Sequence, residues 1–105
     1  MRPNRMSHPE IQKASTRVPN WTVESDPRDA LYLEWKGSSF VEAFALMTDI
    51  SELAEELNHH PEWFNVYSKI CIRLTTHDVG GLSELDFTLA ERIDALIRAR
   101  STEKK

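Results

Sequence analysis

The spacing of apolar residues changes on the two sides of Pro61, and this change restricts the fold more than any other feature of the sequence. After Pro61, residues 69–77 alternate between apolar and polar side chains, as in a strand with one buried face. Before it, apolar residues recur every three to four positions, as on one face of a helix: Phe40, Ala43, Phe44, Met47, Ile50, Ala54 and Leu57. A long helix followed by a half-buried strand predicts a mixture of helices and antiparallel sheet.

Residues that favour helix termini mark both ends of this helix. Ser38 and Ser39 are candidate N-caps, because a short hydroxyl side chain accepts hydrogen bonds from the first free N–H groups. We expect the helix to end near Asn58, which tolerates a left-handed backbone, since Pro61 also pushes the residue before it towards extended geometry. The two histidines that follow Asn58 are therefore expected at the helix exit.

The remaining segments complete a predicted α+β domain with a four-stranded antiparallel sheet and helices packed on one face. Two short strands, at residues 21–24 and 30–35, precede the long helix, and a third, at residues 64–67, follows it. A last helix begins after Ser83, and its apolar stripe is Leu85, Leu89, Ile93 and Leu96. We expect one domain at 20–98, with a tail at 1–19 that has a helical turn near 9–14, and a charged tail at 99–105.

Composition excludes several function classes. A chain of 105 residues supports one core, and 13 Lys and Arg against 17 Asp and Glu give a net charge of −4, which argues against direct binding of nucleic acid. No apolar run is long enough to span a membrane, and no segment looks like a secretory signal. Cys71 is a lone cysteine, so the chain is expected in a reducing compartment, the cytoplasm, with the nucleus as the alternative.

Three of the four histidines lie within nineteen positions and at predicted element ends, near two acidic residues. Glu55 and His59 are four residues apart on one helix face, so this carboxylate is expected to hold the imidazole in one tautomer. Two histidines can supply one acid and one base near neutral pH, which an elimination of water requires. His60, His77 and Asp86 complete the candidate site.

The pattern of these residues resembles the pterin-4a-carbinolamine dehydratases, in which an acidic or polar residue, His-His-Pro, an aromatic residue, His and Asp follow at fixed spacing. The matching positions here are Glu55, His59, His60, Pro61, Tyr67, His77 and Asp86. The run HHPEWFNVYSKI and residues 76–86 are also similar to the family. The resemblance covers about residues 20–98, and the segment before it departs from the regular helix that is usual in the family.

The resemblance implies dehydration of 4a-hydroxytetrahydrobiopterin to quinonoid dihydrobiopterin, a step in the recycling of tetrahydrobiopterin for aromatic amino acid hydroxylases. It assigns the acid and base roles to His59 and His77, without settling which residue does which, and it makes His60 the residue that holds the substrate. It implies no cofactor and no metal. Contacts to the pterin ring are expected from Pro61, Trp63, Phe64, Thr76, Asp78 and Val79.

Two of these residues also have a structural interpretation. Ser83 and Asp86 form a capping-box pattern for the last helix, and Asp86 can serve this cap and the cleft together if its second oxygen faces the cleft. Glu55 taken alone is a solvated helix residue. A further alternative is a zinc site built from His59, His60, His77 and Asp86, although adjacent histidines diverge and no His-x-x-x-His pair is present.

The last alternative is a protein-interaction module. Some members of the family bind the dimerisation helix of a homeodomain transcription factor through a helical surface. The long helix has a second apolar row, Val41, Ala45, Leu46 and Leu53, which widens its apolar face. This face, around Val41, Ala45 and Thr48, suits another helix, and a second copy of the chain is the simpler partner, giving a dimer or a dimer of dimers.

Overall fold

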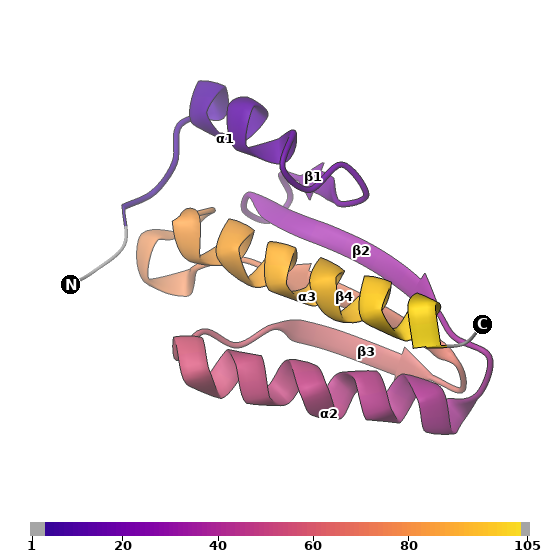
Figure 1. Cartoon of the computed structure of the whole chain (residues 1–105). Helices are drawn as coiled ribbons and strands as arrows, with labels where there is room; N and C mark the ends of the chain where they lie inside the picture. The colour runs from indigo at the N-terminus through magenta and orange to yellow at the C-terminus, as the bar shows by residue number, and fades with distance from the viewer. Residues whose placement is uncertain (1–3, 104–105) are drawn as a thin grey trace.

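Figure 1 shows the fold in a computed structural model, which describes residues 4–103. The elements along the chain are α1 (His8–Ser15), β1 (Thr22–Glu24), β2 (Ala30–Lys36), α2 (Phe40–Leu57), β3 (Glu62–Val66), β4 (Lys69–Leu74), the 3-10 turn η1 (His77–Val79) and α3 (Glu84–Glu103). Among these helices, none is both long and apolar enough to cross a membrane.

The four strands form one antiparallel sheet in the order β1-β2-β4-β3. The expected alternation of β4 is confirmed, because Ile70, Ile72 and Leu74 are fully buried while Cys71 and Arg73 on the other face are partly exposed. The buried face joins residues of all three α-helices in one core, so the helices cover one side of the sheet and the other side stays open. The predicted fold class is confirmed.

Both predicted ends of α2 are confirmed. The Ser39 hydroxyl accepts a hydrogen bond from the N–H of Glu42 at 3.1 Å, and Asn58 caps the other end with a left-handed backbone, φ 51°. The rotation of the helix differs from the expected stripe. Leu46 of the second row is fully buried, whereas Phe44 of the first row is 56% exposed, because α2 turns the line Ala43, Leu46, Ile50 and Ala54 towards the core.

Strand β4 ends three residues before the expected position. The Thr75 hydroxyl donates to the carbonyl oxygen of Asp29 at 2.8 Å, and Thr76 pairs with Gly81 in an isolated bridge. The bridge between Thr76 and Gly81 closes a tight loop, so His77 opens η1 and does not continue the strand. Strand β3 also begins earlier than expected, at Glu62.

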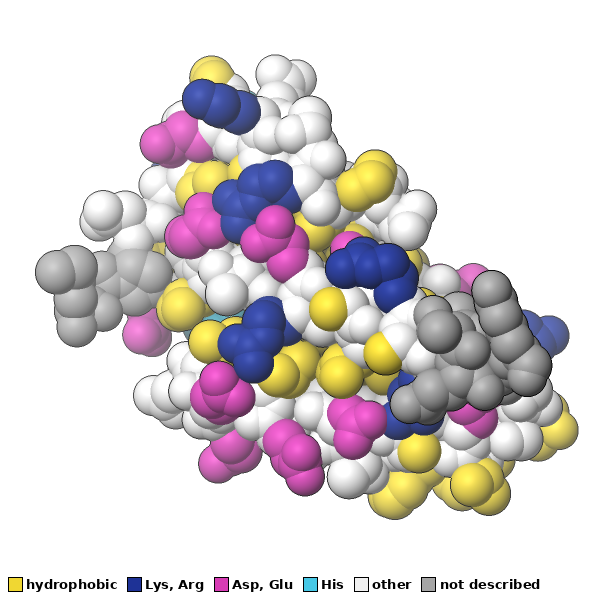
Figure 2. Space-filling view, viewed as in Figure 1, with side chains coloured by type: hydrophobic (Ala, Val, Ile, Leu, Met, Phe, Trp, Pro, Cys, Tyr) yellow, Lys and Arg dark blue, Asp and Glu magenta, His cyan; other side chains and the backbone are white. Residues whose placement is uncertain are grey.

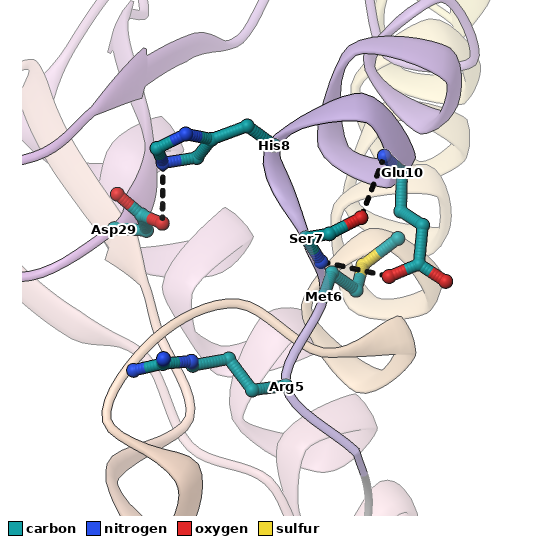
Figure 3. Close-up of a pocket in the computed structure, with 6 residues that line it drawn as sticks. All are labelled: Arg5, Met6, Ser7, His8, Glu10 and Asp29. Atoms are coloured by element: carbon teal, nitrogen blue, oxygen red, sulfur yellow. Dashed lines mark hydrogen bonds and ion pairs between the residues drawn. The ribbon is translucent and has the colours of Figure 1, made fainter.

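The segment expected as an N-terminal tail carries a capped helix that packs on the domain. Figure 3 shows its start, where the Ser7 hydroxyl accepts from the N–H of Glu10 at 3.3 Å and the Glu10 carboxylate accepts from the N–H of Ser7 at 2.7 Å. Ile11 and Val18 are buried in the core. At the other end of the chain, α3 continues to Glu103, beyond the expected limit of the domain.

Candidate active site

The candidate residues come from three segments that meet at one end of the sheet. His59 and His60 follow the end of α2, His77 opens η1, and Asp86 lies in the first turn of α3. Hydrogen bonds link these segments, and each of the three histidines contacts a carboxylate. The structure therefore brings the predicted histidines into a set of imidazole–carboxylate pairs.

The most buried pair is His59 with Asp86. The Nε2–H of His59 donates to Oδ1 of Asp86 at 2.6 Å, and the Asp86 side chain is fully buried. Its other oxygen, Oδ2, accepts from the Thr76 hydroxyl at 2.8 Å and from the N–H of Ser83 at 2.9 Å. Asp86 thus makes the capping contact with one oxygen and the histidine contact with the other. On the face that carries α3, Figure 2 shows only a small area of histidine surface.

The expected contact between Glu55 and His59 is wrong. Oε2 of Glu55 lies 2.7 Å from Nε2 of His60. The left-handed residue Asn58 causes the difference, because it reverses the chain after α2 and lets the N–H of His59 donate to the carbonyl oxygen of Ala54. His59 consequently turns beneath the helix end towards α3, and His60 returns to Glu55.

The partner of His77 was missed by the sequence analysis. Its Nε2 lies 2.8 Å from Oε2 of Glu62, the first residue of β3. Glu62 follows the His-His-Pro run directly, but the sequence gives no contact between it and His77 until β3 and β4 are paired in register. In that register Glu62 stands opposite Arg73, and His77 lies just beyond the end of β4.

The three pairs share one chemical property. In each of them Nε2 faces a carboxylate, so a neutral ring keeps its proton on Nε2 and carries its lone pair on Nδ1. Such a ring accepts a proton at Nδ1, and the protonated ring donates one from the same atom. Two rings of this kind can perform the acid and the base steps of one elimination.

The residues expected around the pterin are distributed unevenly. Thr76 is buried. Its N–H donates to the carbonyl oxygen of Gly81, and its carbonyl oxygen accepts from the N–H groups of Gly81 and Val79, so both backbone groups are hydrogen-bonded within the loop. Trp63 is partly buried and packs on the core, whereas Phe64 lies on the open face of the sheet. Pro61 and Val79 are partly exposed and Asp78 is exposed.

Tyr67 does not join the histidines. It occupies the turn between β3 and β4 with a φ of 52°, and it is largely exposed. Five residue steps separate it from Glu62, which is roughly 16 Å along an extended strand. Within the part of the chain that the structure describes, no group of three or more His, Cys, Asp or Glu residues is arranged to hold a metal ion.

Comparisons with known proteins identify the family of this chain. The family model described as pterin 4 alpha carbinolamine dehydratase matches residues 4–96, so the match includes α1. A relative from Sinorhizobium medicae is 43% identical over 95% of this chain and 94% of its own length. A relative from Synechococcus sp. is 49% identical over 83% of this chain and 90% of its own length. Both carry the name pterin-4-alpha-carbinolamine dehydratase. A crystal structure from Brucella melitensis, described as a transcriptional coactivator/pterin dehydratase, matches with a TM-score of 0.82 and 36% identity over 88% of this chain and 97% of that one. The chain belongs to the pterin-4-alpha-carbinolamine dehydratase family.

Proposed function

We propose that this protein eliminates water from 4a-hydroxytetrahydrobiopterin to give quinonoid dihydrobiopterin, in the recycling of tetrahydrobiopterin. The observation that carries the proposal is the pair of histidines, His59 and His77, each bound through Nε2 to a carboxylate at the same end of the sheet. Membership of the family supplies the substrate class. The free thiol of Cys71 fits a reducing compartment, so we place the reaction in the cytoplasm.

The proposed elimination needs one proton donated to the substrate and one proton removed from it. An imidazolium donates a proton to the 4a-hydroxyl group, which leaves as water, while a neutral imidazole removes the proton of a ring N–H. His59 and His77 perform these two steps, and no metal or nucleophile takes part. His60 is exposed and is held by Glu55, so we assign it to substrate binding.

The test is the dehydration rate of freshly generated 4a-hydroxytetrahydrobiopterin, followed by ultraviolet absorbance. We expect His59→Ala and His77→Ala each to lower kcat by about 10²- to 10⁴-fold. The double variant should lose less than the product of the two effects, because the residues work as a unit. His60→Ala should mainly raise KM. A chelator should leave the rate of the unmodified protein unchanged.

His8→Ala is the matched control. His8 lies on α1, where its Nε2 is 3.6 Å from Oδ2 of Asp29, and it belongs to none of the three pairs at the active site (Figure 3). Its replacement should leave kcat and KM unchanged. Folded protein that does not accelerate the reaction, or equal rates for the unmodified protein and both single active-site variants, would contradict the proposal.

A second candidate function is protein interaction, and exposed apolar side chains on α2 favour it. Phe40 and Phe44 are exposed, with ring centroids 5.9 Å apart, and Val41 between them is 76% exposed. In Figure 2 hydrophobic side chains gather at the lower right, over the first turns of α2. We propose that a second copy of this chain covers this surface. A partner protein, as in a coactivator, is the alternative occupant.

A further inference from the structure

We infer that Glu62 is a positioning residue for His77, whose ring it holds so that Nδ1 is the nitrogen that exchanges protons. This inference rests on the proposed dehydration and adds to it a residue to which the family resemblance assigns no role. Glu62 lies outside the core cluster, and its carboxylate contacts His77, Arg28 and Arg73. These contacts connect His77 with the open face of the sheet.

The Glu62 carboxylate is held on both of its oxygens. Oε2 lies 2.8 Å from Nε2 of His77 and 3.9 Å from Nη1 of Arg28, while Oε1 lies 3.4 Å from Nε of Arg73. Glu62 and Arg73 are also direct partners in the register of β3 and β4. The backbone pairing and the ion pair therefore fix the carboxylate together.

Arg73 is itself anchored across the sheet. Its Nη1 donates to Oε1 of Glu24 on β1 at 2.5 Å, and its Nη2 donates to the carbonyl oxygens of Arg28 at 3.3 Å and Asp26 at 3.5 Å. The Arg73 side chain is only 19% exposed. An exposed ion pair contributes little when both side chains must be ordered to form it. Here the guanidinium is already ordered by other contacts, so less conformational entropy is lost when Glu62 binds it.

His77 depends on such a contact more than His59 does. The His59 ring is buried against α3, whereas the His77 side chain is 62% exposed on a turn of three residues. An exposed imidazole without a fixed partner samples several rotamers and both neutral tautomers. The carboxylate of Glu62 selects the tautomer with the proton on Nε2, which leaves the lone pair of the neutral ring on Nδ1.

The test compares Glu62→Ala and Glu62→Gln in the full chain, with Glu34→Gln as the control. Glu34 is a carboxylate on the same sheet face and pairs with Lys69 at 3.8 Å. Long-range ¹H–¹⁵N spectra of the imidazole rings report the tautomer of His77 without any substrate. We expect the Nε2–H tautomer in the unmodified protein, a tautomer mixture in Glu62→Ala, and no change in Glu34→Gln.

The kinetic arm should agree with the spectra. Glu62→Ala should lower kcat by about 10- to 100-fold with little change in KM, by analogy with the effect of removing carboxylates that orient metal-binding imidazoles. Glu62→Gln retains an oxygen that accepts from Nε2–H, so it should keep the tautomer and recover much of kcat. Equal melting temperatures would show that the loss in Glu62→Ala is not a loss of folding.

The outcomes separate this inference from the proposed function. An unchanged tautomer of His77 in Glu62→Ala overturns the inference whatever the activity is. An unchanged kcat with an altered tautomer overturns the role of Glu62 in the reaction. If the unmodified protein does not dehydrate the substrate, the proposed function fails, and the spectra still decide whether Glu62 orients His77.

Discussion

Asp86 shows how one residue can serve folding and chemistry together. A fully buried carboxylate is costly unless hydrogen bonds replace its water, and this one accepts from Ser83, Thr76 and His59. The first two contacts attach the loop after β4 to the start of α3, and the third fixes the His59 ring. The candidate active site therefore shares its hydrogen bonds with the start of the last helix.

We predict that Asp86→Ala lowers the free energy of unfolding by about 2 to 4 kcal/mol, because it leaves buried donors without acceptors. It should also lower kcat by about 10²-fold or more, since the His59 ring loses its partner. Urea unfolding and the absorbance assay measure the two effects. Ser83→Ala is the control: it should lower stability by about 1 kcal/mol and leave kcat near the unmodified value, because His59 keeps its carboxylate. A kcat loss for Ser83→Ala as large as for Asp86→Ala would refute the separation.

Asp94 on α3 gives a prediction about pH. Burial raises the pKa of Asp94 above its ordinary value of 3.8, although its Oδ1 accepts from the Trp21 Nε1–H at 2.9 Å. The Asp94 carboxylate therefore binds a proton more tightly in the folded chain than in the unfolded chain. The free energy of unfolding consequently falls as pH rises from 3.8 through the pKa of Asp94 in the folded chain. Asp94→Asn keeps the acceptor without the charge. It should be more stable than the unmodified protein at pH 7 and equally stable near the ordinary pKa, by urea midpoints. A less stable variant at pH 7 would contradict this.

Elements were predictable where their signals are local. The caps of α2 and the alternation of β4 depend on neighbouring residues, and both predictions are confirmed. The rotation of α2 was not predictable, because two apolar rows compete and the contacts with β4 and α3 decide between them. In the site, Asp86 could be found from the capping pattern. Glu62 could not be found, since its contact depends on strand register.

Helix α1 illustrates the same limit, because its stability comes from contacts distant in sequence. Eight residues form few helical hydrogen bonds, yet Ile11 is buried and Arg17 binds both Glu84 and Glu91 of α3. The two carboxylates raise the pKa of the Arg17 guanidinium above its ordinary value, so the guanidinium keeps its charge in this link. A short helix that looks marginal in sequence is thus part of the domain.

We predict that Ile11→Ala lowers the free energy of unfolding by about 2 to 4 kcal/mol, the usual cost of removing a buried aliphatic side chain. Gln12→Ala, an exposed change on the same helix, should have little effect. Urea unfolding followed by tryptophan fluorescence measures both, since Trp21 is buried near this helix in the core cluster. If the two variants are equally stable, α1 does not contribute to the cooperative unit.

At the scale of the whole molecule, the open parts of the fold suggest how copies meet. The edge strand β3 has one unpaired side and carries the exposed residues Phe64 and Val66. The first turns of α2 expose a second apolar surface, Phe40, Val41 and Phe44. A small domain gains stability from association because it buries a smaller share of its surface alone. Two separate surfaces would permit a dimer through one and a dimer of dimers through both.

We predict that the purified protein is a homo-oligomer and that Phe44→Glu reduces its size. Phe44 is 56% exposed in the single chain, so a charge there should not disturb the core, but it would be buried without a partner in a helix–helix interface. Light scattering after size-exclusion chromatography measures the mass. Gln12→Glu adds the same charge at an exposed position of α1, outside the proposed interface on α2, and it should leave the mass unchanged. A monomeric unmodified protein would contradict self-association. An unchanged mass in Phe44→Glu would instead place the interface elsewhere, with β3 the next surface to test.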